Sequence, residues 1–231
     1  MSGETLRVGG RSESVHQAVQ WVQDYFDAEA NRAAAAVAKG RPYAFPAYDR
    51  METGSEPNEL NDGDLLASVL LHVAPKLHSF LNLQAVRPDL KAVLAAIPPR
   101  LTLQDAVASG GHAVPLRRIG DLLDSPALLR GVGGTTLMKI MHHKRPLFLP
   151  LYDSRVYACY CGPGSPYPIR PSSRRTWAQF LPLLGEAMAR DLDDQPDTWK
   201  VLKECAPDDV SVLRVLDVVA WTLGSRKTRE P

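Results

Sequence analysis

The residues best suited to chemistry are those of a glycine-rich turn at positions 131–134. The turn Gly131-Val132-Gly133-Gly134 follows the apolar pair Leu128-Leu129, and apolar residues recur with helical spacing at 137, 140 and 141. This pattern predicts a helix, a tight hairpin and a second helix. Glycine permits a positive φ and leaves backbone N–H groups unshielded at a helix N-terminus, where the dipole favours an anion. We therefore expect a phosphate to bind the backbone of Gly131, Val132, Gly133, Gly134 and Thr135.

Cationic side chains follow the turn. Lys139 and His143 are four residues apart, so a helix places them on one face, and Lys144 and Arg145 come next. Together they could contact several phosphates, which makes DNA the expected partner. The alternative is a solvated helix end whose cations balance the helix dipole. A second candidate patch, in which Trp177 is alternatively a core residue, consists of Tyr167, Arg170, Arg174, Arg175 and Trp177.

Asp153 is the carboxylate that follows these cations, in the segment Pro150-Leu151-Tyr152-Asp153. It directly precedes Ser154-Arg155-Val156, so one interpretation is structural: Asp153 caps a helix that begins at Ser154. An ion pair with Arg155 would be a second structural role. A functional role remains open beside both, and capping and catalysis can coexist in one residue.

The order of turn and aspartate resembles the helix-hairpin-helix DNA glycosylase superfamily, which includes endonuclease III and the adenine and 8-oxoguanine glycosylases. The matching pieces are Leu129-Arg130-Gly131-Val132-Gly133 and Pro150-Leu151-Tyr152-Asp153, within residues 128–153. The resemblance implies that Asp153 is catalytic, stabilising positive charge on the sugar or activating a water, and that the target nucleotide is flipped out. Bifunctional members carry a Schiff-base lysine where this chain has Thr135. The resemblance therefore implies a monofunctional DNA N-glycosylase without lysine-dependent lyase activity.

A second resemblance covers most of the chain, from about residue 40 to residue 223. It rests on Pro46-Ala47-Tyr48-Asp49, Asp64-Leu65-Leu66-Ala67, His143-Lys144-Arg145-Pro146, residues 150–156 and Leu213-Arg214-Val215-Leu216-Asp217. These segments resemble a bacterial family of uncharacterised proteins, DUF6308. The resemblance implies no activity, but it implies that the loop at 46–50 and the segment 142–156 belong to one compact unit. The loop residues Tyr48, Asp49 and Arg50 either serve a site or tie down a surface loop.

Cysteine and histidine spacing argues against a bound metal or cofactor. Cys159 and Cys161 form a Cys-x-Cys without further ligands at metal-binding spacing, and the four-cysteine iron–sulfur pattern of endonuclease III is absent. His72 and His78 are six residues apart, which does not place two ligands on one helix face. We expect no metal and no cofactor.

The composition does not by itself indicate nucleic acid. The 231 residues include 27 Lys and Arg against 26 Asp and Glu, for a net charge of +1. No signal peptide and no apolar run of about 18 residues is present, and the three cysteines are sparse. We expect a cytoplasmic protein without membrane contact, and the oligomeric state is open.

The hydrophobic periodicity predicts an all-α protein, and the resemblance implies a helical bundle like the helix-hairpin-helix glycosylase fold. We expect one helical domain over 12–223, between a flexible N-terminus at 1–11 and a basic tail at 224–231. The expected helices include one from residue 15 to 26 capped by Ser12 or Ser14, which the alanine run could extend to 38, then 65–83 with a kink at Pro75, 89–97, 102–108, one after Ser172 or Ser173, and 210–223 after Asp208-Asp209, while 115–123 and 126–129 lead up to the hairpin. Residues 191–196 are expected to be a solvated connection.

Two functions therefore compete. The first is a DNA-binding protein that resembles a monofunctional helix-hairpin-helix glycosylase, with the phosphate held at 131–134 and Asp153 at the sugar. The alternative is a non-catalytic nucleic-acid-binding or protein-interaction member of an uncharacterised family.

Overall fold

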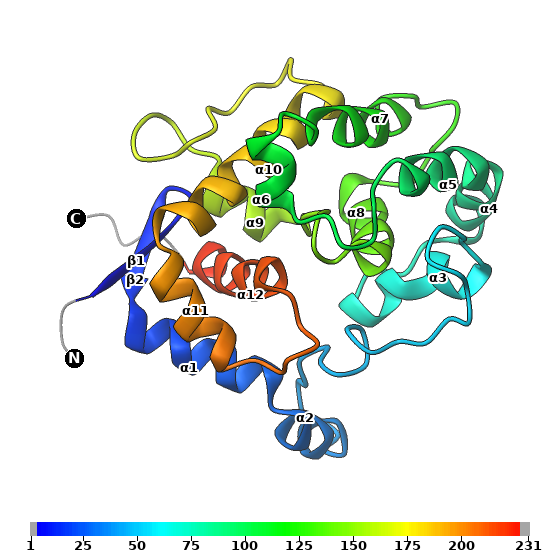
Figure 1. Cartoon of the computed structure of the whole chain (residues 1–231). Coiled ribbons are helices and arrows are strands. Elements are labelled where there is room, and N and C mark those ends of the chain that lie inside the picture. The colour runs from blue at the N-terminus through cyan, green and yellow to red at the C-terminus, as the bar shows by residue number, and fades with distance from the viewer. Residues whose placement is uncertain (1–3, 227–231) are drawn as a thin grey trace.

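A computed structural model describes residues 4–226 of the chain, and the fold is mostly helical (Figure 1). The elements in order are β1 (Thr5–Val8), β2 (Arg11–Ser14), α1 (Val15–Phe26), α2 (Ala28–Ala35), α3 (Asp62–Leu66), the 3-10 helix η1 (Ala67–Leu71), α4 (Leu77–Ala85), α5 (Arg87–Ala95), α6 (Leu103–Ala108), α7 (Ala113–Leu123), α8 (Gly134–Lys144), α9 (Ser154–Tyr160), α10 (Trp177–Asp194), α11 (Pro196–Glu204) and α12 (Val212–Ser225). The helical prediction is confirmed for most of the chain, but a small sheet is added to it.

The N-terminal segment is a β-hairpin and not the flexible stretch predicted for residues 1–11. Strands β1 and β2 pair antiparallel around Gly9-Gly10, with Val8 opposite Arg11. Leu6 and Val8 alternate with exposed residues and are fully buried in the main core. Four-residue strands give too short an alternation to be recognised in a sequence, and this is why the hairpin was not predicted. Residues 1–3 lie outside the described part.

Local hydrogen bonds decide where the helices begin. Ser14 caps α1 as predicted, because its side chain accepts a hydrogen bond from the backbone of Gln17. Two caps differ from the prediction: Thr176 rather than Ser172 or Ser173 begins α10, and Ser211 rather than Asp208 or Asp209 begins α12. Thr176 forms a capping box with Gln179, which satisfies two backbone donors at once.

The long helix predicted at 65–83 is divided into three pieces. After α3, the chain tightens into η1, which ends at His72 with a left-handed φ of 59°. Pro75 then precedes the start of α4 at Leu77. A proline cannot continue the hydrogen-bond ladder, so the apolar periodicity is correct while the continuity is not. The helix that the alanine run could extend to residue 38 is likewise interrupted at Asp27, which caps α2.

Segments far apart in the sequence build one continuous core. The β-hairpin, α1, α11 and α12 lie together on one side of the molecule, and α3, α4 and α5 lie on the other (Figure 1). Helix α8 lies between them, and eight of its residues are buried. Helix α10 crosses α7 closely at Gly120, which has no side chain: an added Cβ there would overlap the backbone of Ala178. Within residues 4–226, no helix is long and apolar enough to cross a membrane.

The connection predicted at 191–196 is instead helical and partly buried. Helix α10 continues to Asp194, and α11 begins at Pro196. The Asp191 carboxylate accepts hydrogen bonds from the backbone of Gly9 at 2.7 Å and from the Tyr160 hydroxyl at 2.8 Å. It therefore ties α10 to the N-terminal hairpin. Of the basic tail predicted at 224–231, the first residues finish α12, and residues 227–231 lie outside the described part.

Candidate functional site

The glycine-rich turn leads into a helix, as its sequence predicts. Gly131 has a φ of +79°, which a residue with a side chain rarely adopts, and Gly133 is the N-cap of α8. Among the described residues, no side chain caps this helix end. The preceding helix is α7, which ends at Leu123, and residues 125–129 form an irregular turn in place of the predicted short helix. The local geometry thus leaves the first backbone N–H groups of α8 uncapped.

Only part of the turn is open to a ligand. Ser79 donates a hydrogen bond to the Gly131 carbonyl at 2.9 Å, so the turn rests on α4. An added Cβ on Gly134 would overlap the Trp177 ring, whereas one on Gly133 would meet open space. Val132 is buried and Thr135 is half-buried. The glycines at 131 and 134 therefore also serve packing. Gly131 and Gly133 are exposed, and of these two only Gly133 has open space where a Cβ would stand.

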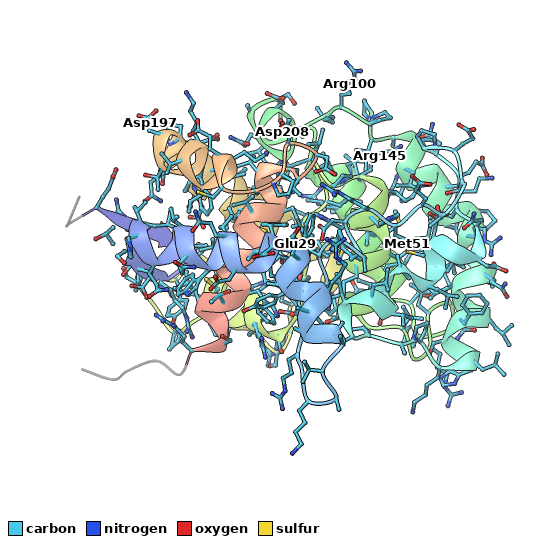
Figure 2. All side chains as sticks on the ribbon, turned by 90° about the horizontal axis from the view of Figure 1, so that it is seen from below. Glu29, Met51, Arg100, Arg145, Asp197 and Asp208 are labelled. Carbon is cyan, nitrogen blue, oxygen red and sulfur yellow. The ribbon has the colours of Figure 1, made fainter. Side chains whose placement is uncertain are left out.

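Arg145 is a structural residue. Its side chain is 1% exposed, and its guanidinium donates to the carbonyls of Ile97 at 2.7 Å and Leu94 and Pro57 at 2.8 and 2.7 Å. Figure 2 shows Arg145 among the side chains inside the molecule, while Arg100 extends from its surface. Its donors satisfy carbonyls of the preceding helices and loop and do not face a phosphate.

His143 and Lys144 hold the loop at 51–58. The Lys144 ammonium donates to the Ser55 hydroxyl at 2.6 Å and lies 3.5 Å from the buried Asp64 carboxylate. The His143 ring contacts the Met51 carbonyl at 3.1 Å through Nε2. In this structure Lys144 is thus paired with the loop, because a mostly buried charge needs a partner. Burial lowers the pKa of His143, which therefore contacts the loop as an uncharged ring.

Lys139 is separated from this group and lies at a cavity of about 390 Å3. The cavity lies where the segment at 41–44, the end of η1, α8, the start of α9 and α12 meet. Its lining includes Tyr43, Lys139, Asp153, Arg155, Asp217 and Trp221. Of the residues predicted to form a site, the structure therefore brings Lys139 and Asp153 together.

Asp153 caps α9 and faces this cavity. Its Oδ1 atom accepts hydrogen bonds from the backbone N–H groups of Arg155 at 2.9 Å and Val156 at 3.0 Å. The Arg155 guanidinium instead lies over the Trp221 ring at 4.1 Å, and the described residues contain no ion pair between Arg155 and Asp153. The capping role is thus present, and the carboxylate remains available to the cavity.

The Lys139 ammonium points toward the same space. Its Nζ atom donates to the Leu71 carbonyl at 3.0 Å, and the residue is 8% exposed. Burial lowers the pKa of Lys139, while the charges of Asp153 and Asp217 raise it. The backbone carbonyl of Lys139 accepts a hydrogen bond from Tyr48, which anchors the loop at 46–50 to α8.

A buried charge network forms the floor of the cavity. Arg214 on α12 donates to Asp49 at 2.7 Å, to the Tyr25 hydroxyl at 2.6 Å and to Asp217. Burial opposes the charge of Arg214, but Tyr25, Asp49 and Asp217 raise its pKa well above the ordinary value. The sequence argument missed this network, although Asp49 and the Arg214–Asp217 pair lie in segments that it singled out.

The pKa of Asp217 is raised to about 6, because burial and the Asp153 charge raise it by more than Arg214 lowers it. The pKa values of both Arg214 and Asp217 are raised. The ion pair favours the charged form of both residues, while burial and the nearby Asp153 oppose the charge on Asp217. Arginine stays charged in proteins, so the ion pair is favourable, and burial, with a smaller contribution from the Asp153 charge, is the reason that Asp217 protonates easily. The cavity thus combines a cationic and an easily protonated acidic group.

The comparison with protein families agrees with the second resemblance noted in the sequence. A model of a family of unknown function, DUF6308, matches residues 18–224. The chain belongs to this family. No curated protein matches the chain, and no solved structure matches it.

In this DUF6308 member the matched range contains every residue of the cavity floor. It also contains Cys159 and Cys161, which are free and buried. Burial raises the pKa of Cys159 to about 12 and that of Cys161 to about 11, so neither thiol is a ready nucleophile. Residues 4–226 contain no group of three or more His, Cys, Asp or Glu side chains with a metal-binding arrangement.

Proposed function

We propose that the cavity binds one nucleotide of a DNA strand and that Asp153 is the catalytic carboxylate for release of its base. The observation that carries the proposal is the position of Asp153 at the N-terminus of α9, where it lines a cavity together with Lys139 and Asp217. The helix-hairpin-helix resemblance supports the same role for this aspartate. The nucleotide must leave the base stack to enter, as in other proteins that act on a base.

The chemistry requires a fixed negative charge near the sugar. As the C1′–N bond breaks, its electron pair leaves with the base, which takes up a proton from solvent, and positive charge develops at C1′. A water then adds its oxygen to C1′, and a carboxylate can accept the proton that this water loses. Two backbone N–H groups hold one oxygen of Asp153, so the carboxylate is oriented before a substrate arrives.

The walls suit a planar base. Tyr43 and Trp221 line the cavity and face each other edge to face, with ring centroids 6.5 Å apart. Arg155 covers one face of Trp221, so a base would stack on the Tyr43 ring or on the other face of Trp221. Aromatic side chains stack on any base, so they favour a nucleotide without choosing which one. Thr135 and the hydrogen-bonded Lys139 argue for base release without a lysine-linked intermediate.

The test is base release from a panel of damaged duplex and single-stranded DNAs by wild type and by Asp153→Asn. Asparagine also caps helices, so this variant keeps α9 while losing the charge. We expect the rate of release to fall about 10²–10⁴-fold with little change in thermal stability. Equal turnover by both proteins, or none by wild type on any substrate, would refute the catalytic role.

A non-catalytic nucleic-acid-binding function is the second candidate. It is favoured because Asp153 already has a structural role as the cap of α9. The cations after the turn are structural too: they hold the loop at 51–58 and the preceding helices, and they are His143, Lys144 and Arg145. Salt-sensitive DNA binding by wild type without base release would select this function. The binding would then depend on Arg155 and the open Gly133 backbone more than on Lys144 or Arg145.

A further inference from the structure

A second, smaller pocket of about 120 Å3 adjoins the cavity. Its lining includes Tyr152, Tyr157, Arg175, Trp177 and Phe180. Tyr152 lines both this pocket and the cavity. A ligand that fills the cavity and a group that fills the second pocket would thus both meet the side chain that directly precedes Asp153.

The second pocket is built from aromatic rings in fixed orientations. Tyr152 contacts Trp177 edge to face at 5.1 Å and Phe180 at 5.4 Å, and Trp177 contacts Phe180 at 5.8 Å. Burial raises the pKa of the Tyr152 hydroxyl to about 12, so this ring stays neutral. Such a cluster offers aromatic surface for stacking at little cost in side-chain entropy, because neighbouring rings already hold each one.

Cationic groups lie on both sides of Tyr152. Arg155 lines the cavity, and Arg175 lines the second pocket, where its Nη1 atom donates to the Arg170 carbonyl at 2.6 Å. The acidic groups Asp153 and Asp217 belong to the cavity alone. An aromatic pocket with a cation and no carboxylate suits a nucleobase whose phosphate lies near the arginine.

We propose that the pocket around Trp177 binds the nucleobase adjacent to the one held in the cavity. This inference rests on the proposed function, because it takes the cavity as a nucleotide site. Stacked bases are about 3.4 Å apart along a strand, which leaves no room for an intervening ring. Two bases that meet at Tyr152 from different pockets must therefore be unstacked, so the substrate class is a locally single-stranded segment of at least two nucleotides.

The experiment compares Kd values for the four deoxynucleoside 5′-monophosphates with those for the 5′-phosphorylated dinucleotides of the same bases. Wild type should bind a dinucleotide about tenfold more tightly than its mononucleotide, since one further base is stacked. Trp177→Leu should lose this advantage and keep the affinity for the mononucleotide. Trp177→Phe, which keeps a ring, should retain most of it.

The mononucleotide serves as the folding control for each variant. If Trp177→Leu fails to fold, Arg175→Gln provides the second test, with an expected loss of part of the dinucleotide advantage. Two results would overturn the role proposed for the second pocket and leave the proposed function standing. One is that wild type binds mononucleotides but binds dinucleotides no more tightly, and the other is that the dinucleotide advantage survives both Trp177→Leu and Arg175→Gln. Binding of neither probe by wild type would overturn the proposed function and the second pocket with it.

Discussion

Arg214 holds two carboxylates and a phenol beneath the cavity, and it is 3% exposed. Transfer of charges from water to such a site costs several kcal/mol per ion unless each finds a partner. Loss of the guanidinium would leave Asp49 and Asp217 buried near each other without a cation between them. The network thus stabilises the wall of the cavity to which Arg214 and Asp217 belong.

We predict that Arg214→Met lowers the free energy of unfolding by about 3–5 kcal/mol, because it leaves buried charges unpaired. Arg50→Met is the matched control, since Arg50 pairs with Asp209 at 2.7 Å but both side chains are about half exposed. The control should change stability little, because solvent screens exposed pairs. Urea unfolding measures both variants, and similar losses in the two would contradict a special role for the buried network.

The raised pKa of Asp191 predicts how the stability of the fold depends on pH. Burial raises its pKa to about 6 in the folded protein, while an unfolded aspartate titrates near about 3.9. The folded state therefore favours the protonated acid, and stability from this group is present below pH of about 4 and lost as the pH rises through about 6. The loss should amount to roughly 2–3 kcal/mol.

Asp191→Asn tests this sign directly. An amide oxygen can still accept the hydrogen bonds from Gly9 and Tyr160, so the contact survives without a titrating group. The difference in unfolding free energy between variant and wild type should grow in favour of the variant between pH 4 and 7. A difference that stays constant across this range would mean that Asp191 is not responsible.

At the scale of the elements, the N-terminus of α8 offers a prediction from its glycines. Gly133 has the extended backbone of an N-cap, with φ −92° and ψ 166°, and a Cβ there meets open space. Gly133→Ser should stabilise the protein by a few tenths of a kcal/mol, because the hydroxyl can cap α8 and glycine is already a tolerated N-cap. Gly134→Ala should destabilise it by about 1–3 kcal/mol, because the added methyl overlaps Trp177. Thermal unfolding of both variants checks the pair, and a destabilised Gly133→Ser would contradict the geometry.

Elements with strong local signals were predictable from the sequence. Helices α1 and α6 begin close to their expected positions, because apolar periodicity and caps such as Ser14 and Thr102 act within a few residues. The turn before α8 and the cap at Asp153 were predictable for the same reason. The breaks at Asp27 and His72 were not, since they depend on tertiary packing that overrides a continuous apolar pattern.

The candidate site was only partly predictable, because its partners are distant in the sequence. Asp153 and Lys139, both singled out from the sequence, line the same cavity, but Arg214 meets Asp49 across 165 positions and Tyr25 across 189. The cations at 143–145 also depend on distant partners in the loop at 51–58. Sequence spacing indicates which residues share a helix face, and it does not indicate what that face is packed against.

At the scale of the whole molecule, the N-terminal hairpin is joined to the last helices through a single core. Gly9 contacts Asp191 of α10, and Arg11 donates to the carbonyl of Leu223 in α12 at 2.7 Å. Leu6 belongs to the same continuous buried cluster as residues of α5, α8 and α12. A defect in the hairpin should therefore weaken the whole fold and not one end of it.

We predict that Leu6→Ala lowers the free energy of unfolding by about 2–5 kcal/mol, because it leaves a cavity in a fully buried position. Arg7→Ala is the control one residue away: its side chain lies on the exposed face of β1, and its hydrogen bonds to Gln195 use the backbone, which the variant keeps. The control should therefore remain close to wild type. Unfolding followed by both tryptophan fluorescence and circular dichroism should give coincident transitions that shift together for Leu6→Ala, because the tryptophans lie in several elements of the one core. Separate transitions, or equal losses for the two variants, would show instead that the hairpin folds apart from the rest.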